Sequence, residues 1–110
     1  MEMASVHEVA AAALRGELVI DVRNADEYSA GHVARSVFMP LPTVPVRTSE
    51  LDRHAPVYVI CESGARAFQA CQYLQQHGYR PINVHGGMTA YRQAGLPFEA
   101  GNRTLAGSRS

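Results

Sequence analysis

Short apolar runs alternate along the chain with segments of helical character. The clearest run, at residues 57–60, is apolar or aromatic throughout, and weaker runs lie at residues 18–22, 36–39 and 82–84. Strands that are apolar on both faces are typical of parallel sheets, because connecting helices cover both sides. The pattern therefore predicts an α/β fold built on a parallel sheet.

Helix signals fill the intervals between these runs. Ser5 and Glu8 fit a capping box, which predicts a helix start, and Gly16 is expected to end that helix. Further helical segments are expected at residues 24–29, 65–77 and 88–94, and a helical turn is expected around residues 49–54. The helix at 65–77 is expected to bury one stripe of side chains, formed by Ala67, Phe68, Cys71 and Leu74.

The length and the balanced charge of the chain favour a single domain that does not bind nucleic acid. A chain of 110 residues with 46% hydrophobic residues suits one compact domain. We expect that domain at residues 1–100 and a flexible tail at residues 101–110, because the tail is small and polar. Lys and Arg together number 10, as do Asp and Glu, so nucleic acid is not an expected partner.

The same composition favours a cytoplasmic protein. No apolar run approaches the roughly 18 residues that a membrane helix needs, so no membrane partner is expected. The first residues lack the basic segment and apolar stretch of a secretory signal. Two cysteines are also too few for a disulfide framework, which fits a reducing compartment.

The junction after residues 57–60 carries the strongest chemical signal. Cys61 follows the strand, and the segment leading into the next helix is Glu62, Ser63, Gly64, Ala65 and Arg66. Ligands of such sheets bind beyond the carboxyl ends of the strands, where backbone N–H groups at a helix start form an anion-binding cradle. A thiol there is favoured as the nucleophilic thiolate. Arg66 adds a fixed positive charge that suits an oxyanion.

Four segments in order form a combined pattern. They are residues 19–23 with 27–28 and 31–33, then 36–37 with Pro40, then 58–66 with Cys-x-Ser-Gly-x-Arg, and finally 84–87 with Tyr91 and Gly95-Leu96-Pro97. Each segment alone is a weak signal, whereas all four together are specific. The combination, which spans residues 18–98, resembles the rhodanese-like sulfurtransferase family.

The resemblance implies a three-layer rhodanese-like fold, with a central parallel sheet of about five strands and helices on both faces. It also implies that Cys61 takes the outer sulfur of a donor such as thiosulfate or a persulfide, and carries it as a persulfide. A thiol such as thioredoxin or glutathione, or cyanide in vitro, would then accept the sulfur. The amides of residues 62–66 would bind the anionic sulfur, and the chemistry needs no cofactor and no metal.

The length of the loop separates this activity from related ones. Cys61 to Arg66 spans six residues, which resembles the sulfurtransferases of this fold. A loop one residue longer resembles that of the phosphatases and arsenate reductases of the same fold. The longer loop suits a phosphate, which is larger than the sulfur of a persulfide. A small phosphatase or arsenate reductase is thus the lesser alternative. A non-catalytic binding or regulatory module is another, against which the intact Cys61 argues.

Residues around the loop have more than one interpretation. Glu62 departs from the family pattern, and its charge opposes thiosulfate and the thiolate, so the donor could be a neutral or protein-bound persulfide. Arg66 could bind the donor, support the loop, or both. Asp21 and Arg23 are expected to brace the loop rather than react. His32 could be a general base, but the resemblance implies a buried, hydrogen-bonded residue that shapes a turn.

Other chemically capable residues are interpreted as structural. Cys71 lies too far along the helix from Cys61 for a disulfide, so a core role is expected rather than that of a resolving thiol. Gly86 and Gly87 lack the spacing and lysine of a phosphate loop and are interpreted as a turn. The histidines lack metal-ligand spacing, so no metal site is expected.

Overall fold

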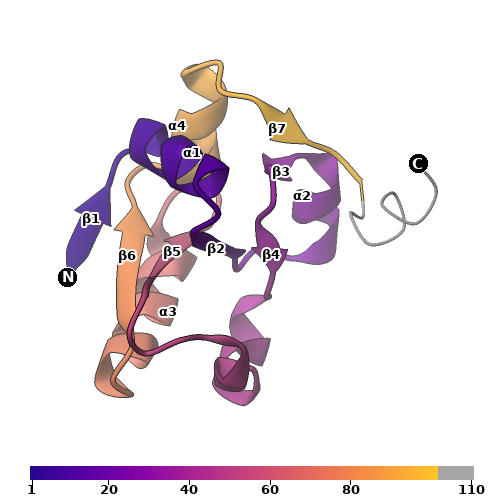
Figure 1. Cartoon of the computed structure of the whole chain (residues 1–110). Coiled ribbons are helices and arrows are strands. Elements are labelled where there is room, and N and C mark those ends of the chain that lie inside the picture. The colour runs from indigo at the N-terminus through magenta and orange to yellow at the C-terminus, as the bar shows by residue number, and fades with distance from the viewer. Residues whose placement is uncertain (102–110) are drawn as a thin grey trace.

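A parallel five-stranded sheet forms the centre of the molecule (Figure 1). The computed structural model describes residues 1–101, so the tail expected at 101–110 lies outside the described residues apart from Gly101. The strand order is β1-β6-β5-β2-β4, and every pair in it is parallel. The strands are β1 (Glu2–Ala4), β2 (Leu18–Asp21), β4 (Val37–Phe38), β5 (Pro56–Ile60) and β6 (Arg80–Val84). The predicted parallel sheet is confirmed, with β5 in its middle.

Within residues 1–101, four α-helices connect or cover these strands. They are α1 (Val6–Leu14), α2 (Ala25–Ala30), α3 (Ala65–Gln76) and α4 (Gly87–Gln93). The predicted capping box at the start of α1 is present, because Ser5 and Glu8 bond each other's backbone N–H groups. Helices α2, α3 and α4 each begin just after the carboxyl end of a strand, which brings their first turns to one edge of the sheet.

The core consists of two clusters, one on each face of the sheet. Side chains alternate along the strands, so Ile20 belongs to one cluster and its neighbour Val19 to the other. The first cluster includes Cys71 and Leu74 of α3, and the second joins α1 to Met88 of α4. Helices therefore cover both faces, as the predicted three-layer fold requires.

The helical turns after β4 differ from the prediction at residues 49–54. Two 3₁₀ turns form instead, η1 (Leu41–Val46) and η2 (Thr48–Glu50). The carbonyl of Pro40 accepts bonds from the backbone N–H and the hydroxyl of Thr43, which starts η1. Helical turn η2 covers only the start of the expected turn at 49–54; beyond it, the Asp52 carboxylate accepts the His54 N–H at 2.8 Å and forms a local side-chain turn.

One residue of the expected stripe on α3 is not buried. Phe68 is 45% exposed, whereas Ala67, Cys71 and Leu74 are fully buried as expected. Ala70 completes the buried face instead. Successive residues of a helix are about 100° apart, so Phe68 lies well to the side of the face that begins at Ala67.

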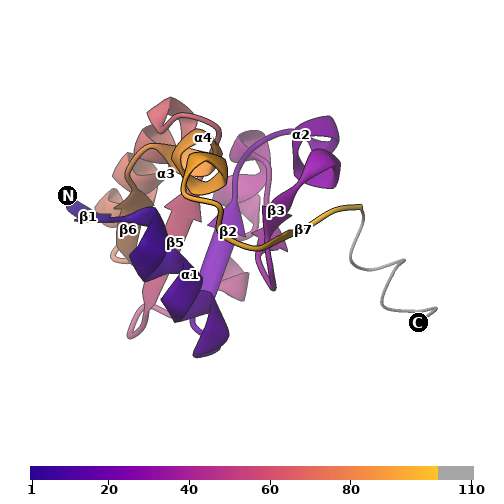
Figure 2. The same cartoon turned by 90° about the horizontal axis from the view of Figure 1, so that it is seen from above.

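A small antiparallel sheet lies beside the main one. It pairs β3 (His32–Val33) with β7 (Phe98–Glu99), and together with α2 it lies at the β4 side of the molecule, away from β1 (Figures 1 and 2). Among residues 1–101, no helix combines the length and hydropathy needed to cross a membrane.

Candidate active site

Cys61 lies at the carboxyl end of the central strand. It is the first residue after β5, and it is 1% exposed. Its Sγ accepts a hydrogen bond from the backbone N–H of Gly64 at 2.9 Å. This contact places a backbone donor directly at the sulfur of the loop.

The bend between Cys61 and α3 depends on Gly64. This residue precedes the helix with φ of 117°, a conformation that residues with a side chain rarely adopt. A Cβ built on Gly64 would have no atom within 4 Å, so the requirement is conformational rather than steric. The bend turns the Gly64 N–H back toward the sulfur. Ser63 and Ala65 are exposed on the outside of this bend.

Helix α4 packs directly on the backbone of the Cys61 loop. The carbonyl of Cys61 accepts the Met88 N–H at 2.8 Å, and the carbonyl of Glu62 accepts the Thr89 N–H at 3.0 Å. A Cβ on Gly87 would lie 2.4 Å from the Cys61 oxygen, so only glycine allows this approach. Gly86 lies in the expected turn, whereas Gly87 is the first residue of α4, and its close approach to the loop could not be read from the sequence.

A buried ion pair lies beside the loop at the end of β2. Arg23 and Asp21 are 1% and 0% exposed, and the guanidinium bonds both carboxylate oxygens at 2.8–3.2 Å. The same guanidinium donates to the Gly31 carbonyl at 2.7 Å. These contacts tie the end of β2 to the end of α2.

Arg66 pairs with Glu27 on the other side of the loop. Two of its nitrogens donate to the two Glu27 oxygens at 2.7 and 2.9 Å, which joins α3 to α2. The Arg66 hydrogen bonds lower the pKa of Glu27 to about 2, despite the opposing effect of partial burial. Of the two roles left open for Arg66, the contacts are those of loop support.

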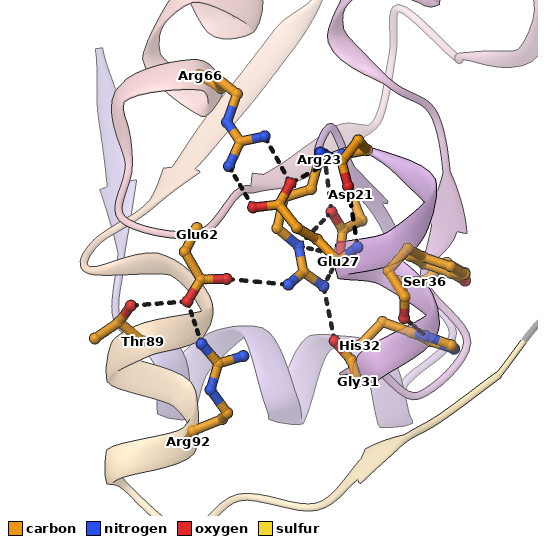
Figure 3. A network of polar contacts seen from close by, with 12 residues as sticks. Asp21, Arg23, Glu27, Gly31, His32, Ser36, Glu62, Arg66, Thr89 and Arg92 are labelled. Carbon is orange, nitrogen blue, oxygen red and sulfur yellow. Dashed lines mark hydrogen bonds and ion pairs between the residues drawn. The ribbon is translucent and has the colours of Figure 1, made fainter.

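Glu62 lies at the meeting point of three segments (Figure 3). One of its oxygens accepts from Arg23 at 3.1 Å, and the other accepts from the Thr89 hydroxyl at 3.0 Å and from Arg92. Partial burial opposes its ionisation, but the Thr89 bond and the arginine charges outweigh burial and lower its pKa. The sequence marks Glu62 as a negative charge beside Cys61, but it does not reveal the two arginines that offset that charge.

His32 is buried at the start of β3. Its Nδ1 lies 2.7 Å from the Tyr28 carbonyl, and its ring stacks on the Tyr28 ring at 3.7 Å between centroids. The Tyr28 hydroxyl in turn donates to the Ser36 carbonyl at 2.7 Å. These contacts join His32 to α2 and, through Tyr28, to the segment before β4.

The second cysteine belongs to the core. Cys71 is fully buried in α3, and both cysteines are free thiols. Burial raises the pKa of Cys71 to about 12, which keeps its thiol protonated and unreactive at neutral pH. Within residues 1–101, no group of three or more His, Cys, Asp or Glu side chains could hold a metal ion.

Known proteins similar in sequence to this chain include sulfurtransferases. The chain is 39% identical over 84 residues to a sulfurtransferase of Allochromatium vinosum, covering 76% of this chain and 78% of that protein. It is 31% identical to the putative sulfurtransferase YtwF of Bacillus subtilis, covering 78% of this chain and 90% of that protein.

Solved structures of the same architecture superpose closely. A rhodanese-like domain protein from Staphylococcus aureus matches with a TM-score of 0.82 and 25% identity, over 93% of this chain and all of that one. A rhodanese-related protein from Thermoplasma volcanium also matches with a TM-score of 0.82 and 25% identity, over 90% and 98% of the two chains. Residues 5–94 match the rhodanese-like domain family, and the chain belongs to it.

Proposed function

We propose that the chain is a sulfurtransferase in which Cys61 carries a sulfane sulfur as a persulfide. The observation that carries the proposal is the Gly64 N–H directed at Sγ, on a nucleophile at the carboxyl end of the central strand. Relatives of similar length that are named sulfurtransferases support the same class of reaction.

The reaction would take two displacement steps. In the first, the Cys61 thiolate attacks the outer sulfur of a donor, for which thiosulfate is one candidate. The sulfur–sulfur bond of thiosulfate breaks, sulfite leaves with the electron pair, and Cys61 holds a persulfide anion. In the second, an acceptor thiolate or cyanide attacks the outer sulfur, and the Cys61 thiolate leaves.

The surrounding residues would position the reacting sulfur. The amides of residues 62–66, with Gly64 the one bonded to Sγ, would stabilise the persulfide anion. Asp21, Arg23 and His32 would act as positioning residues, because their contacts bind the ends of β2 and α2. The partners would be a small sulfur donor and a thiol such as thioredoxin or glutathione, in the reducing cytoplasm that the two free thiols suit.

Intact mass spectrometry after incubation with thiosulfate, or with a low-molecular-weight persulfide, tests this proposal. The wild type should gain one sulfur atom and lose it when cyanide or a thiol is added. Cys61→Ser should gain nothing. Cys71→Ser is the matched control, since it removes the buried thiol and should load as the wild type does. No gain with either donor would leave a non-catalytic binding module as the better interpretation.

A further inference from the structure

Three donor groups hold the carboxylate of Glu62, one residue after the nucleophile. The Arg23 guanidinium bonds one oxygen, while the Thr89 hydroxyl and Arg92 bond the other (Figure 3). Two arginines and a hydroxyl make a receptor for an oxyanion such as a carboxylate or a sulfonate. In this chain a side chain of the loop itself fills that receptor.

Arg23 and Arg66 each bond a carboxylate other than that of Glu62. Arg66 is held by Glu27 through two bonds, and Arg23 bonds Asp21 as well as Glu62. Carboxylates therefore offset the positive charges of the arginines that surround the loop. An incoming sulfonate would have to displace Glu62 or share Arg92 with it, and Arg92 is 42% exposed.

We infer that Glu62 is a specificity-determining residue, which occupies the oxyanion receptor beside Cys61 and so disfavours dianionic donors of the thiosulfate type. The preferred donor is then the persulfide of a thiol, which brings no sulfonate to the loop. The Cys61 thiolate attacks the outer sulfur of R–S–SH, the sulfur–sulfur bond breaks, and RS⁻ leaves as Cys61 becomes the persulfide. This inference rests on the proposed sulfur transfer.

The charge of the donor provides the test, because repulsion by Glu62 grows with that charge. A unit charge about 6 Å away in a water-like medium changes the binding of a dianion about tenfold and that of a monoanion about threefold. Thiosulfate and methanethiosulfonate form such a pair. Both give their outer sulfur to Cys61, releasing sulfite and methanesulfinate respectively.

The experiment measures kcat/KM for both donors, with cyanide as acceptor, in the wild type and in Glu62→Gln. We expect Glu62→Gln to raise kcat/KM by about tenfold for thiosulfate and about threefold for methanethiosulfonate. Arg92→Gln, which leaves the Glu62 charge less offset, should lower both values, thiosulfate more strongly. Glu2→Gln is the matched control: it removes the same charge from an exposed pair with Arg80, at the opposite end of the parallel strands, and should change neither value.

Two results would overturn the inference. An equal change for both donors in Glu62→Gln would mean that Glu62 acts only by shaping the loop. A fall in kcat/KM for thiosulfate in Glu62→Gln would mean that the carboxylate helps the donor. Mass spectrometry of the wild type tests the proposed function first. If the wild type gains no sulfur mass from any donor, the proposed sulfur transfer fails, and the donor preference is not the cause. Thermal unfolding of each variant checks that the fold is kept.

Discussion

The loop after Cys61 is held from two sides that differ in burial. Toward β2 and α4, Asp21 and Arg23 form a bridge that is at most 1% exposed, and Gly87 touches the loop backbone. Toward α2, the bridge between Arg66 and Glu27 is 36% and 28% exposed, and Gly64 has open space around it. Each side has one ion pair and one glycine. Because the two sides differ in burial, they should contribute very differently to the free energy of unfolding.

The largest difference is expected between the two arginines. Arg23→Met leaves the Asp21 carboxylate buried without its partner, which should cost about 3–5 kcal/mol of unfolding free energy. Arg66→Met removes the partner of a partly exposed carboxylate and should cost below about 1 kcal/mol. Urea denaturation of both variants measures the two costs. Equal losses of unfolding free energy in the two variants would show that the difference in burial between the two ion pairs does not affect stability.

A matched pair of glycine variants sharpens the comparison further. Gly87→Ala places a Cβ 2.4 Å from the Cys61 oxygen and should cost about 2–4 kcal/mol, since overpacking adds to an unfavourable positive φ. Gly64→Ala meets no atom and should cost only the conformational part, about 1–2 kcal/mol.

The readout for these glycines is the unfolding free energy together with sulfur loading of Cys61. Gly87→Ala should impair loading because it displaces α4 from the loop. In the wild type, the N–H groups of Met88 and Thr89 bond the carbonyls of the loop. Gly64→Ala should impair loading through reorientation of the N–H that faces Sγ. A Gly87→Ala variant as stable as the wild type would contradict the close packing of α4 on the loop.

The sequence predicts the parts of this fold that depend on local pattern. The apolar run at 57–60 and the capping box at Ser5 are complete within a few residues, and both are confirmed. Strand β1 could not be predicted, because its three residues gain strand character only by pairing with β6, about 80 positions later. The β3–β7 pair, two residues on each strand, depends on a similar long-range contact.

The same limit applies to the site. Cys61 and the bend at Gly64 follow from adjacent residues, so the sequence locates them. The partners of Glu62 lie 39 and 30 positions away, at Arg23 and Arg92, and no local pattern reveals them. The role of Arg66 stays open in the sequence for the same reason, since its partner Glu27 lies 39 positions away.

The smallest expected effect is a pH dependence confined to the exposed side. The bridge to Arg66 lowers the pKa of Glu27 from 4.5 to about 2, so the folded protein binds this proton more weakly than the unfolded chain does. The resulting stability is fully present above about pH 4.5 and is lost as the pH falls through 2. Solvent screening limits it to below about 1 kcal/mol.

Comparing the wild type with Arg66→Met between pH 6 and pH 2 isolates this contribution. Without the guanidinium, the pKa of Glu27 should return toward its ordinary value, so the variant should be less stable at pH 6. The difference in unfolding free energy should shrink as the pH falls below about 4.5 and be largely lost near pH 2, because Glu27 is then protonated in the unfolded chain and in the variant and about half protonated in the folded wild type. A difference that is independent of pH would instead assign the effect of Arg66 to packing of its side-chain stem between α2 and α3.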